Sequence, residues 1–309
     1  MKIVILDALT FGDTSLSGFF KLGDVDVFQT TSPQQTQERI AHAEVIVTNK
    51  VVITSEHISN SPALKLICVA ATGMNNVDLE AAKKRDIEVK NVSGYSTDSV
   101  IQHTFSMLFY LVGHSRYYDE YVKEGSYAKS PIFTDVSQPF FEIKGKRWGI
   151  IGLGEIGRGV ARVAETFGAD LCYFSTSGKN SSQDYEQLEL EELLKTCHII
   201  SIHAPLNEKT ANLLGYEELL MCTEGAVVLN LGRGGIIDEA AVAKIIDEKN
   251  ISFGLDVLSR EPMEENHPLL SVKNRANLYI TPHIAWTSVE ARQKLIAGVI
   301  ENIKSSISR

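Results

Sequence analysis

Three glycines at the spacing Gly152-x-Gly154-x-x-Gly157 are the most chemically informative residues of this 309-residue chain. An apolar strand-like segment, Trp148–Ile151, runs directly into them. In such a turn the first glycine permits a tight bend, the second lets a backbone approach a pyrophosphate, and the third lets a helix pack closely on its strand. The free N–H groups and positive dipole at the helix start then face the phosphates. The spacing therefore predicts a dinucleotide site.

The segments around these glycines decide between cofactor binding and a plain glycine turn. A helical pattern follows the motif, with Ile156, Val160, Val163, Ala164 and Phe167 on one face, and a second strand is expected at Leu171–Phe174. Strand, glycine turn, helix and strand within about 30 residues form the context in which this motif binds a dinucleotide. We therefore favour cofactor binding.

The rest of the chain alternates strand and helix patterns, which predicts parallel sheets covered by helices. The expected strands are Lys2–Leu6, Val25–Phe28, Val45–Thr48, Leu66–Ala70, Ile87–Val92, His198–His203, Ala226–Leu231, Ser252–Val257 and Leu278–Thr281. The expected helices are Pro33–His42, Ser55–Ser59, Leu79–Arg85, Leu188–Thr196, Tyr216–Met221, Glu239–Glu248 and Val289–Ile303, with one long helix over Thr97–Tyr118 and an irregular loop over 125–147.

Composition describes an ordinary globular protein of about two domains, with 44% hydrophobic and 22% charged residues. A net charge of −9 argues against nucleic acid or an anionic membrane as the main partner. No apolar run is long enough to span a bilayer. The four cysteines (Cys68, Cys172, Cys197 and Cys222) are scattered, which is typical of buried thiols in a reducing compartment, so we expect a cytoplasmic protein. No Cys/His spacing suggests a metal site.

Four further features have both a functional and a structural interpretation. Arg233 lies between glycines, which suggests close approach of backbone segments, whereas Glu261 before Pro262 and His283 after Pro282 are more often structural when taken alone. The turn Ala71–Asp78 follows a predicted strand, where ligands bind in open α/β sheets. It can equally be a structural turn in which Asp78 caps the next helix.

Taken together, several segments resemble the D-isomer-specific 2-hydroxyacid dehydrogenases. They are Gly152-Leu-Gly-Glu-Ile-Gly157, Asn230-Leu-Gly-Arg-Gly-Gly-Ile-Ile-Asp-Glu239, Asp256-Val-Leu-Ser-Arg-Glu-Pro262, Thr281-Pro-His-Ile-Ala-Trp286, the turn Ala71–Asp78 and the helix start Gly94-Tyr-Ser-Thr-Asp-Ser-Val100. The resemblance covers nearly the whole chain and is strongest to the glycerate dehydrogenase, or hydroxypyruvate reductase, branch. It implies two doubly wound parallel-sheet α/β domains. A Rossmann dinucleotide-binding domain (99–286) is inserted in a flavodoxin-like substrate domain (1–98 and 287–309).

The resemblance also implies roles for individual residues. His283 matches the acid/base, Glu261 the carboxylate that bonds it, and Arg233 the arginine that grips the substrate carboxylate, where a planar fork suits bidentate binding. Substrate contacts are implied at Thr72, Gly73, Ser96 and Trp286. Cofactor contacts are implied at Thr72, Gly152, Gly154, Glu155, Ile156, Gly157, Ser175, Thr176, Lys179, His203, Ala204, Pro205, Thr210, Leu231, Gly232, Asp256 and Ala285. The other histidines are expected to be surface or packing residues.

Two positions leave the choice between NAD and NADP open. NAD-specific sites of this kind place an acidic residue at the end of the second strand, where it accepts hydrogen bonds from the ribose. Ser175 stands there in this chain, followed by a hydroxyl-rich loop and Lys179, which suits a 2′-phosphate. Against NADP, Glu155 places a carboxylate beside the cofactor phosphates.

We therefore expect an NAD(P)-dependent oxidoreductase that interconverts a small 2-keto acid and its D-2-hydroxy acid, with hydroxypyruvate or glyoxylate as first candidates. Pyruvate, with D-lactate as its product, is the alternative within this class. An NAD(H)-sensing corepressor-like binding protein is the alternative from another class, and the absence of long disordered tails argues against it. The resemblance implies a homodimer, built through the Thr97–Tyr118 helix and the 125–147 loop.

Overall fold

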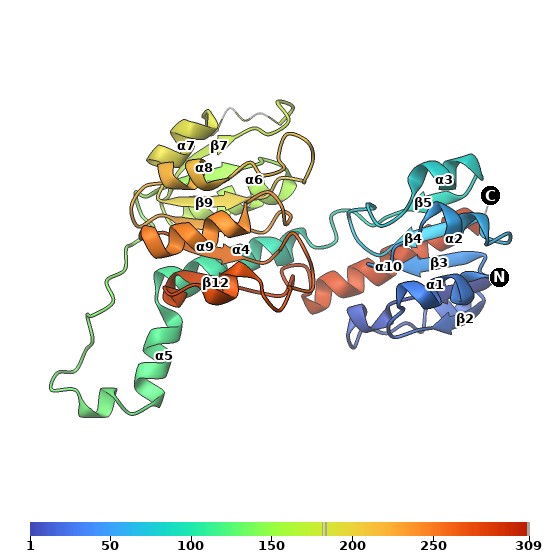
Figure 1. The fold of residues 1–309 in the computed structure, drawn as a ribbon, viewed down its shortest axis with the longest axis horizontal. Coiled ribbons are helices and arrows are strands. Elements are labelled where there is room, and N and C mark those ends of the chain that lie inside the picture. Colours follow the sequence, from blue (N-terminus) through green and yellow to red (C-terminus); the bar gives the residue numbers. More distant parts are fainter. Residues whose placement is uncertain (181, 183, 308–309) are drawn as a thin grey trace. The chain divides into compact units, whose positions relative to one another are not determined.

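The computed structural model describes residues 1–180, 182 and 184–307, and they form two compact units (Figure 1). The first unit comprises Met1–Ser96 together with Trp286–Arg309, and the second comprises Thr97–Ala285. The boundaries predicted after residues 98 and 286 fall two residues and one residue from these. The last two residues of the predicted first domain, 308 and 309, lie outside the described part. One α/β unit is thus inserted in another.

The first unit holds five parallel strands in the order β2-β1-β3-β4-β5, which is the flavodoxin-like order. The strands are β1 (Lys2–Ile5), β2 (Asp24–Val27), β3 (Val45–Thr48), β4 (Leu66–Val69) and β5 (Glu88–Lys90). Because side chains alternate across a strand, Ile3 and Ile5 pack on one face with Leu295, whereas Val4 packs on the other with Ile40. Helix α10 (Val289–Ile307) therefore covers one face, and α1 (Pro33–Ile40), α2 (Ser55–Ser59) and α3 (Leu79–Lys84) cover the other.

The second unit holds seven parallel strands in the order β12-β11-β10-β9-β6-β7-β8. They are β6 (Arg147–Ile151), β7 (Asp170–Phe174), β8 (Glu186–Gln187), β9 (Ile199–Ile202), β10 (Val227–Asn230), β11 (Ser252–Leu255) and β12 (Leu278–Ile280). This is the Rossmann order with one strand added. Helices α4 (Thr97–Val112) and α6 (Glu155–Thr166) pack on one face, and α7 (Leu190–Thr196), α8 (Tyr216–Met221) and α9 (Glu239–Glu248) pack on the other. The predicted fold class is confirmed.

The prediction of one long helix over Thr97–Tyr118 is wrong, because two helices occupy this segment. Helix α4 ends at Val112, and α5 runs over Ser115–Lys123. Between them His114 takes the left-handed backbone conformation, with φ of 45°, which ends the first helix. The sequence pattern also did not predict strand β8 or the short 3-10 helices at Ala8–Phe11, Phe19–Lys21, Tyr127–Lys129, Pro268–Ser271 and Arg275–Asn277.

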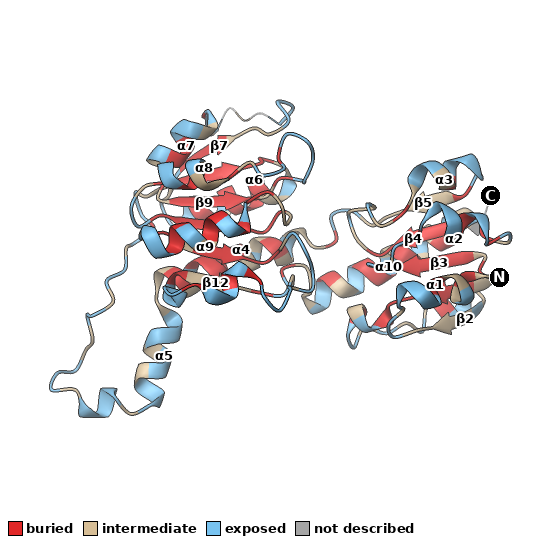
Figure 2. Ribbon diagram, viewed as in Figure 1, coloured by how far each residue is buried: buried red, intermediate tan, exposed pale blue. Residues whose placement is uncertain are grey.

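Helix α5 and the segment after it stand out from the body of the second unit (Figure 2). No residue of α5 is buried. The exposed large side chains here include Tyr117, Val122, Ile132, Phe133 and Val136, and Phe133 is 88% exposed. The predicted irregular loop over 125–147 contains one 3-10 turn, Tyr127–Lys129. We call residues 115–141 the arm.

The remaining expectations concern cysteines and membranes. All four cysteines are buried and free, as predicted. In the described part of the chain, no helix combines the length and apolarity that crossing a membrane requires.

Candidate active site

The residues singled out in the second unit lie on loops that follow neighbouring parallel strands. The glycine loop follows β6, Ser175 follows β7 and His203 follows β9, while Arg233, Glu261 and His283 follow β10, β11 and β12. Because all these strands are parallel, their carboxyl ends meet at one edge of the sheet. That edge, and above all the point between β6 and β9 where the strand order reverses, is where such folds bind ligands.

The glycine loop fits a dinucleotide. Gly152 has φ of 94°, and a Cβ on it would lie 2.9 Å from the amide nitrogen of Ala204, so the loops after β6 and β9 touch here. A Cβ on Gly157 would lie 2.4 Å from the carbonyl oxygen of Gly152. At Gly154, by contrast, no described atom lies within 4 Å of an added Cβ. Two glycines therefore serve packing, and the third leaves the helix start open to a ligand.

Helix α6 begins beside this open position. Gly154 is its N-cap and provides no side-chain cap, so the first N–H groups of the helix are available to an anion. The carboxylate of Glu155 is exposed and accepts a hydrogen bond of 3.0 Å from the hydroxyl of Thr97. Ile156 packs against the core behind the helix. The residues thus fit a bound pyrophosphate, with Glu155 held to one side by Thr97.

The loop after β7 is closed by its own serine. The hydroxyl of Ser175 accepts a hydrogen bond of 3.1 Å from the backbone of Gly178 and donates one of 3.2 Å to the carbonyl of Asn180. Thr176 is half-buried and Lys179 is exposed. The loop therefore presents a cation and no carboxylate over residues 175–180.

The loop after β9 contains an unpartnered histidine. Both ring nitrogens of His203 are buried without a hydrogen-bond partner among the described residues. Burial lowers the pKa of His203 to about 3, so the ring is neutral. Nearby Thr210 is fully buried, and its hydroxyl donates 2.6 Å to the carbonyl of Pro205. Thr210 thus shapes the Ala204–Pro205 turn from behind and does not present its hydroxyl at the surface.

The loop that carries Arg233 is folded by a side chain that sequence reasoning did not single out. The amide of Asn230 donates 2.9 Å to the carbonyl of Arg233 and accepts 3.1 Å from the N–H of Gly232. The guanidinium of Arg233 donates 2.8 Å to the carbonyl of Gly232 and is partly exposed. Leu231 and Gly232 are buried under it. The strand end, through Asn230, therefore sets where the guanidinium emerges.

Glu261 and His283 form a hydrogen-bonded pair. Oε2 of Glu261 lies 2.8 Å from Nδ1 of His283, and the two side chains are 29% and 22% exposed. Oε1 of Glu261 accepts a hydrogen bond of 3.1 Å from the backbone of Leu258, which orients the carboxylate. With Nδ1 bonded to Glu261, Nε2 is the ring nitrogen that can exchange a proton with a ligand. This geometry suits general acid/base chemistry.

Asp256 holds the loop that carries His283. Its buried carboxylate accepts hydrogen bonds from the hydroxyl of Thr281 (2.6 Å) and from the N–H groups of Ile284 (2.8 Å) and Ala285 (3.0 Å). Its carbonyl accepts 2.8 Å from the N–H of His283. His283 has φ of 54°, a strained conformation that persists only where neighbours enforce it. Asp256 and Ala285, expected to contact the cofactor, are both buried, and the Asp256 carboxylate positions the histidine loop.

His103 on helix α4 supports Asp256 through the hydroxyl of Thr281. Nε2 of His103 lies 3.1 Å from the hydroxyl of Thr281. Since that hydroxyl donates to Asp256, the histidine donates to the hydroxyl and carries its proton on Nε2. Burial lowers the pKa of His103, which favours this neutral form.

The remaining predicted residues lie in the first unit. Thr72 and Gly73 follow β4, and the amide of Asn91 donates 2.6 Å to the carbonyl of Thr72. Asp78 caps α3 by accepting 2.9 Å from the N–H of Ala81, so the structural role of this turn is present. Ser96 is half-buried, and Trp286 packs edge-on against Tyr95 with ring centres 6.1 Å apart.

A buried aspartate at the corresponding edge of the first sheet was also missed. The carboxylate of Asp7, after β1, accepts hydrogen bonds from the backbone N–H groups of Asn49 (2.9 Å) and Lys50 (2.7 Å), after β3. These strands flank the point where the order of the first sheet reverses. A carboxylate close behind a first strand is the sequence signal that could have found it.

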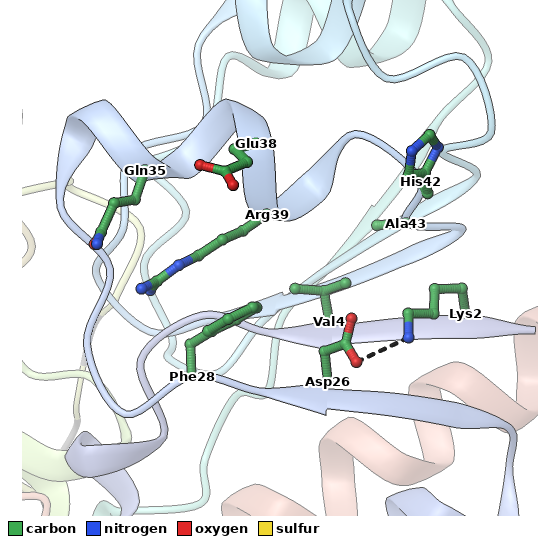
Figure 3. Close-up of a pocket in the computed structure, with 9 residues that line it drawn as sticks. All are labelled: Lys2, Val4, Asp26, Phe28, Gln35, Glu38, Arg39, His42 and Ala43. Carbon is green, nitrogen blue, oxygen red and sulfur yellow. Dashed lines mark ion pairs between the residues drawn. The ribbon is translucent and has the colours of Figure 1, made fainter.

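A cavity of about 570 Å³ in the first unit lies apart from these loops, between α1 and the strands β1 and β2 (Figure 3). Lys2 and Asp26 form an ion pair of 2.8 Å, and the Arg39 guanidinium lies 4.1 Å from the ring centre of Phe28. We assign it no role in the site.

Comparison with known proteins agrees with this geometry. Residues 105–285 match the family model described as the D-isomer specific 2-hydroxyacid dehydrogenase, NAD binding domain. The chain is 33% identical to a hydroxypyruvate reductase of Blautia hydrogenotrophica, covering 98% of this chain and 96% of that protein. It is 32% identical to a glycerate dehydrogenase of Methylorubrum extorquens, covering 99% and 96%.

A solved structure of an acyclic imino acid reductase in complex with NADPH and D-Arg is also similar. It superposes with a TM-score of 0.86 at 28% identity and covers 100% of this chain and 97% of that one. A dinucleotide-binding unit with an open glycine loop, and a match to the family over most of that unit, lead to one conclusion. The chain belongs to the D-isomer-specific 2-hydroxyacid dehydrogenase family and is an NAD(P)-dependent enzyme.

Proposed function

We propose that the protein reduces a small 2-keto acid to its D-2-hydroxy acid, with hydroxypyruvate or glyoxylate as substrate. The observation that carries this proposal is the Glu261–His283 pair of 2.8 Å at the edge of the sheet that also holds the glycine loop and Arg233. The similarity to a hydroxypyruvate reductase and a glycerate dehydrogenase supports this choice of substrate.

The reaction needs a hydride and a proton. The bound nicotinamide supplies the hydride when the cofactor is reduced. His283 supplies the proton from Nε2 to the oxygen of the substrate carbonyl as that oxygen gains negative charge. Glu261 accepts the hydrogen bond from Nδ1 and thereby orients the ring so that Nε2 is left for the substrate. Reduction thus consumes one proton, which solvent restores to His283.

The substrate carboxylate needs a fixed cation. Arg233 offers a planar fork that binds a carboxylate through two parallel hydrogen bonds, and Asn230 fixes the backbone that carries it. We assign this role to Arg233. Further substrate contacts stay predicted at Thr72, Gly73, Ser96 and Trp286. A substitution at such a contact should change the KM for the keto acid and leave the KM for the cofactor unchanged.

Initial rates with purified protein test the proposal. NADH and NADPH are each combined with hydroxypyruvate, glyoxylate, pyruvate and phenylpyruvate. The highest kcat/KM is expected for hydroxypyruvate or glyoxylate. A higher value for pyruvate would make the protein a D-lactate dehydrogenase, and no turnover with any pair while NADH binds would favour a cofactor-sensing binding protein.

Cofactor preference rests on the loop after β7. Lys179 is exposed on a loop without a carboxylate over residues 175–180, so we propose that NADPH is accepted as well as NADH. Lys179→Ala is expected to raise the KM for NADPH several-fold and leave the KM for NADH unchanged. Equal effects on both cofactors would remove Lys179 from 2′-phosphate recognition.

We also propose a cytoplasmic homodimer that buries the arm. A large aromatic and aliphatic surface, including Phe133 and Val136, is exposed there in the single chain, and exposed apolar patches of this kind mark interfaces. Gel filtration with light scattering is expected to give twice the 34.1 kDa chain mass. A Phe133→Asp variant should shift the protein toward the monomer, and a wild type that runs only as a monomer would contradict the proposal.

A further inference from the structure

A second histidine–glutamate pair is buried in the same unit. Nε2 of His267 lies 2.9 Å from Oε2 of Glu239, and both side chains are 8% exposed. His267 was expected to be a surface or packing residue, and Glu239 was expected only to begin a helix. A buried carboxylate is costly unless its oxygens are bonded, so this pair requires an explanation.

The hydrogen bonds of His267 determine its protonation. Nδ1 accepts a hydrogen bond of 3.3 Å from the backbone N–H of Leu269, so this nitrogen carries no proton. Nε2 must then carry the proton, and its N–H donates the hydrogen bond to Glu239. The neutral ring therefore satisfies both its nitrogens and keeps Glu239 as an acceptor.

The carboxylate of Glu239 accepts hydrogen bonds from the turn that carries Glu261. Its Oε1 accepts 2.5 Å from the backbone N–H of Ser259, and its Oε2 accepts 2.9 Å from the hydroxyl of the same serine. Ser259 lies two residues before Glu261, and Leu258 beside it donates to Glu261. A chain of bonds thus runs from His267 through Glu239 to the turn 258–261, and from Glu261 to His283.

Glu239 also ties this turn to the arginine loop. It is the first residue of α9, which follows that loop. A Cβ on Gly234, next to Arg233, would lie only 1.9 Å from the carbonyl oxygen of Leu258, so the two backbones touch. Glu239 therefore fixes the glutamate turn against the segment that presents Arg233.

We propose that Glu239 and His267 are positioning residues that hold the turn 258–261 in place and thereby keep Glu261 against His283. The inference rests on the proposed reduction, in which Glu261 and His283 act together. It assigns to the buried pair no contact with substrate or cofactor.

Substitutions at His267 give the sharpest test. His267→Leu removes the donor to Glu239, whereas His267→Gln retains an N–H donor and an acceptor oxygen. His267→Leu is expected to lower kcat roughly threefold to tenfold with an unchanged Kd for NADH, because it displaces Glu261 without removing it and small displacements of reacting groups are costly. His267→Gln should retain most of kcat. Glu218→Gln, at another first-turn glutamate, which caps α8, is the matched control and should leave kcat unchanged.

A double-mutant cycle shows whether the pair acts through Glu261. In a Glu261→Ala background, His267→Leu should cause no further loss of kcat, because the carboxylate that the turn positions is already gone. Additive losses would overturn the proposal. Equal losses for His267→Leu and His267→Gln would do the same.

A spectroscopic measurement keeps the inference independent of turnover. In protein labelled at histidine nitrogen, the Nδ1–H proton of His283 is assigned by its absence in His283→Asn. The signal should move or broaden in folded His267→Leu and persist in His267→Gln. An unchanged signal in His267→Leu would overturn the inference. A shifted signal in a protein that reduces no keto acid would sustain the positioning role and reject the proposed function.

Discussion

The second unit contains two histidine–glutamate pairs with nearly the same bond length and different surroundings. His283 and Glu261 are 2.8 Å apart, partly exposed, and carried on loops at the edge of the sheet. His267 and Glu239 are 2.9 Å apart and buried, and both nitrogens of His267 are bonded to protein. We propose that the same two residue types serve proton transfer where one nitrogen can reach a ligand, and positioning where neither can.

The largest expected effect separates activity from stability in the exposed pair. His283→Ala should lower kcat by about 10²–10⁴-fold, because it removes the proton donor. Its free energy of unfolding should change by no more than about 0.5 kcal/mol, since the ring is partly exposed. Steady-state kinetics and urea unfolding check both. A kcat within twofold of wild type would remove His283 from the chemistry.

The buried pair should show the converse. His267→Leu is expected to lower the free energy of unfolding by about 3 kcal/mol, because it leaves a buried carboxylate without one of its donors. Urea unfolding followed by tryptophan fluorescence measures this, since Trp148 lies in the core of the same unit. A loss smaller than that of His283→Ala would contradict the contrast between the pairs.

A smaller effect is expected at Glu261. Glu261→Gln preserves the shape of the side chain and replaces the charged partner of His283 with a neutral one, which weakens the hydrogen bond that orients the ring, so kcat should fall roughly tenfold. The KM for the keto acid should change little. Steady-state kinetics with hydroxypyruvate measure this, and a KM effect larger than the kcat effect would place Glu261 in substrate binding instead.

His203, whose ring nitrogens have no hydrogen-bond partner among the described residues, extends the comparison through pH. Burial lowers its pKa to about 3, against an ordinary value of about 6.5. Between these two pH values the histidine is protonated in the unfolded chain and neutral in the folded one. The free energy of unfolding therefore has its full value above about pH 6.5. It falls toward pH 3 by up to about 1.4 kcal/mol per pH unit. Unfolding near pH ~7 and near pH ~5 should show a smaller difference for His203→Gln than for wild type. His42→Gln, at an exposed histidine, is the control.

The strands and helices were predictable to within a few residues because apolar runs and their alternation are local signals. The break at His114 was not, because a single glycine such as Gly113 inside an apolar helical pattern is often tolerated and does not by itself fix where a helix ends. The three glycines of the loop could be interpreted individually, because each requirement is steric and belongs to one position. The positive φ of Gly152 agrees with its predicted tight bend, and the lack of room for a Cβ on Gly157 agrees with its predicted role in packing the helix on its strand.

The candidate site was predictable where motifs carried it, as for the Glu261–His283 pair. The residues that orient these side chains could not be found in the same way. Asn230, Glu239 and His267 make hydrogen bonds to backbone or side-chain groups up to 28 positions away, and pairing over such a separation appears only when loops meet in space. Asp256 illustrates the same point, because resemblance suggested a cofactor contact and the structure shows a carboxylate that holds the histidine loop.

Isotope transfer tests the proposed reaction most directly. Wild-type protein is given hydroxypyruvate and NADH in which both hydrogens at C4 of the nicotinamide are deuterium. The product is isolated and its chirality is determined. The reaction proposed here predicts D-glycerate with deuterium at C2. Unlabelled product or the L isomer would contradict it, and no glycerate at all would exclude hydroxypyruvate as the substrate.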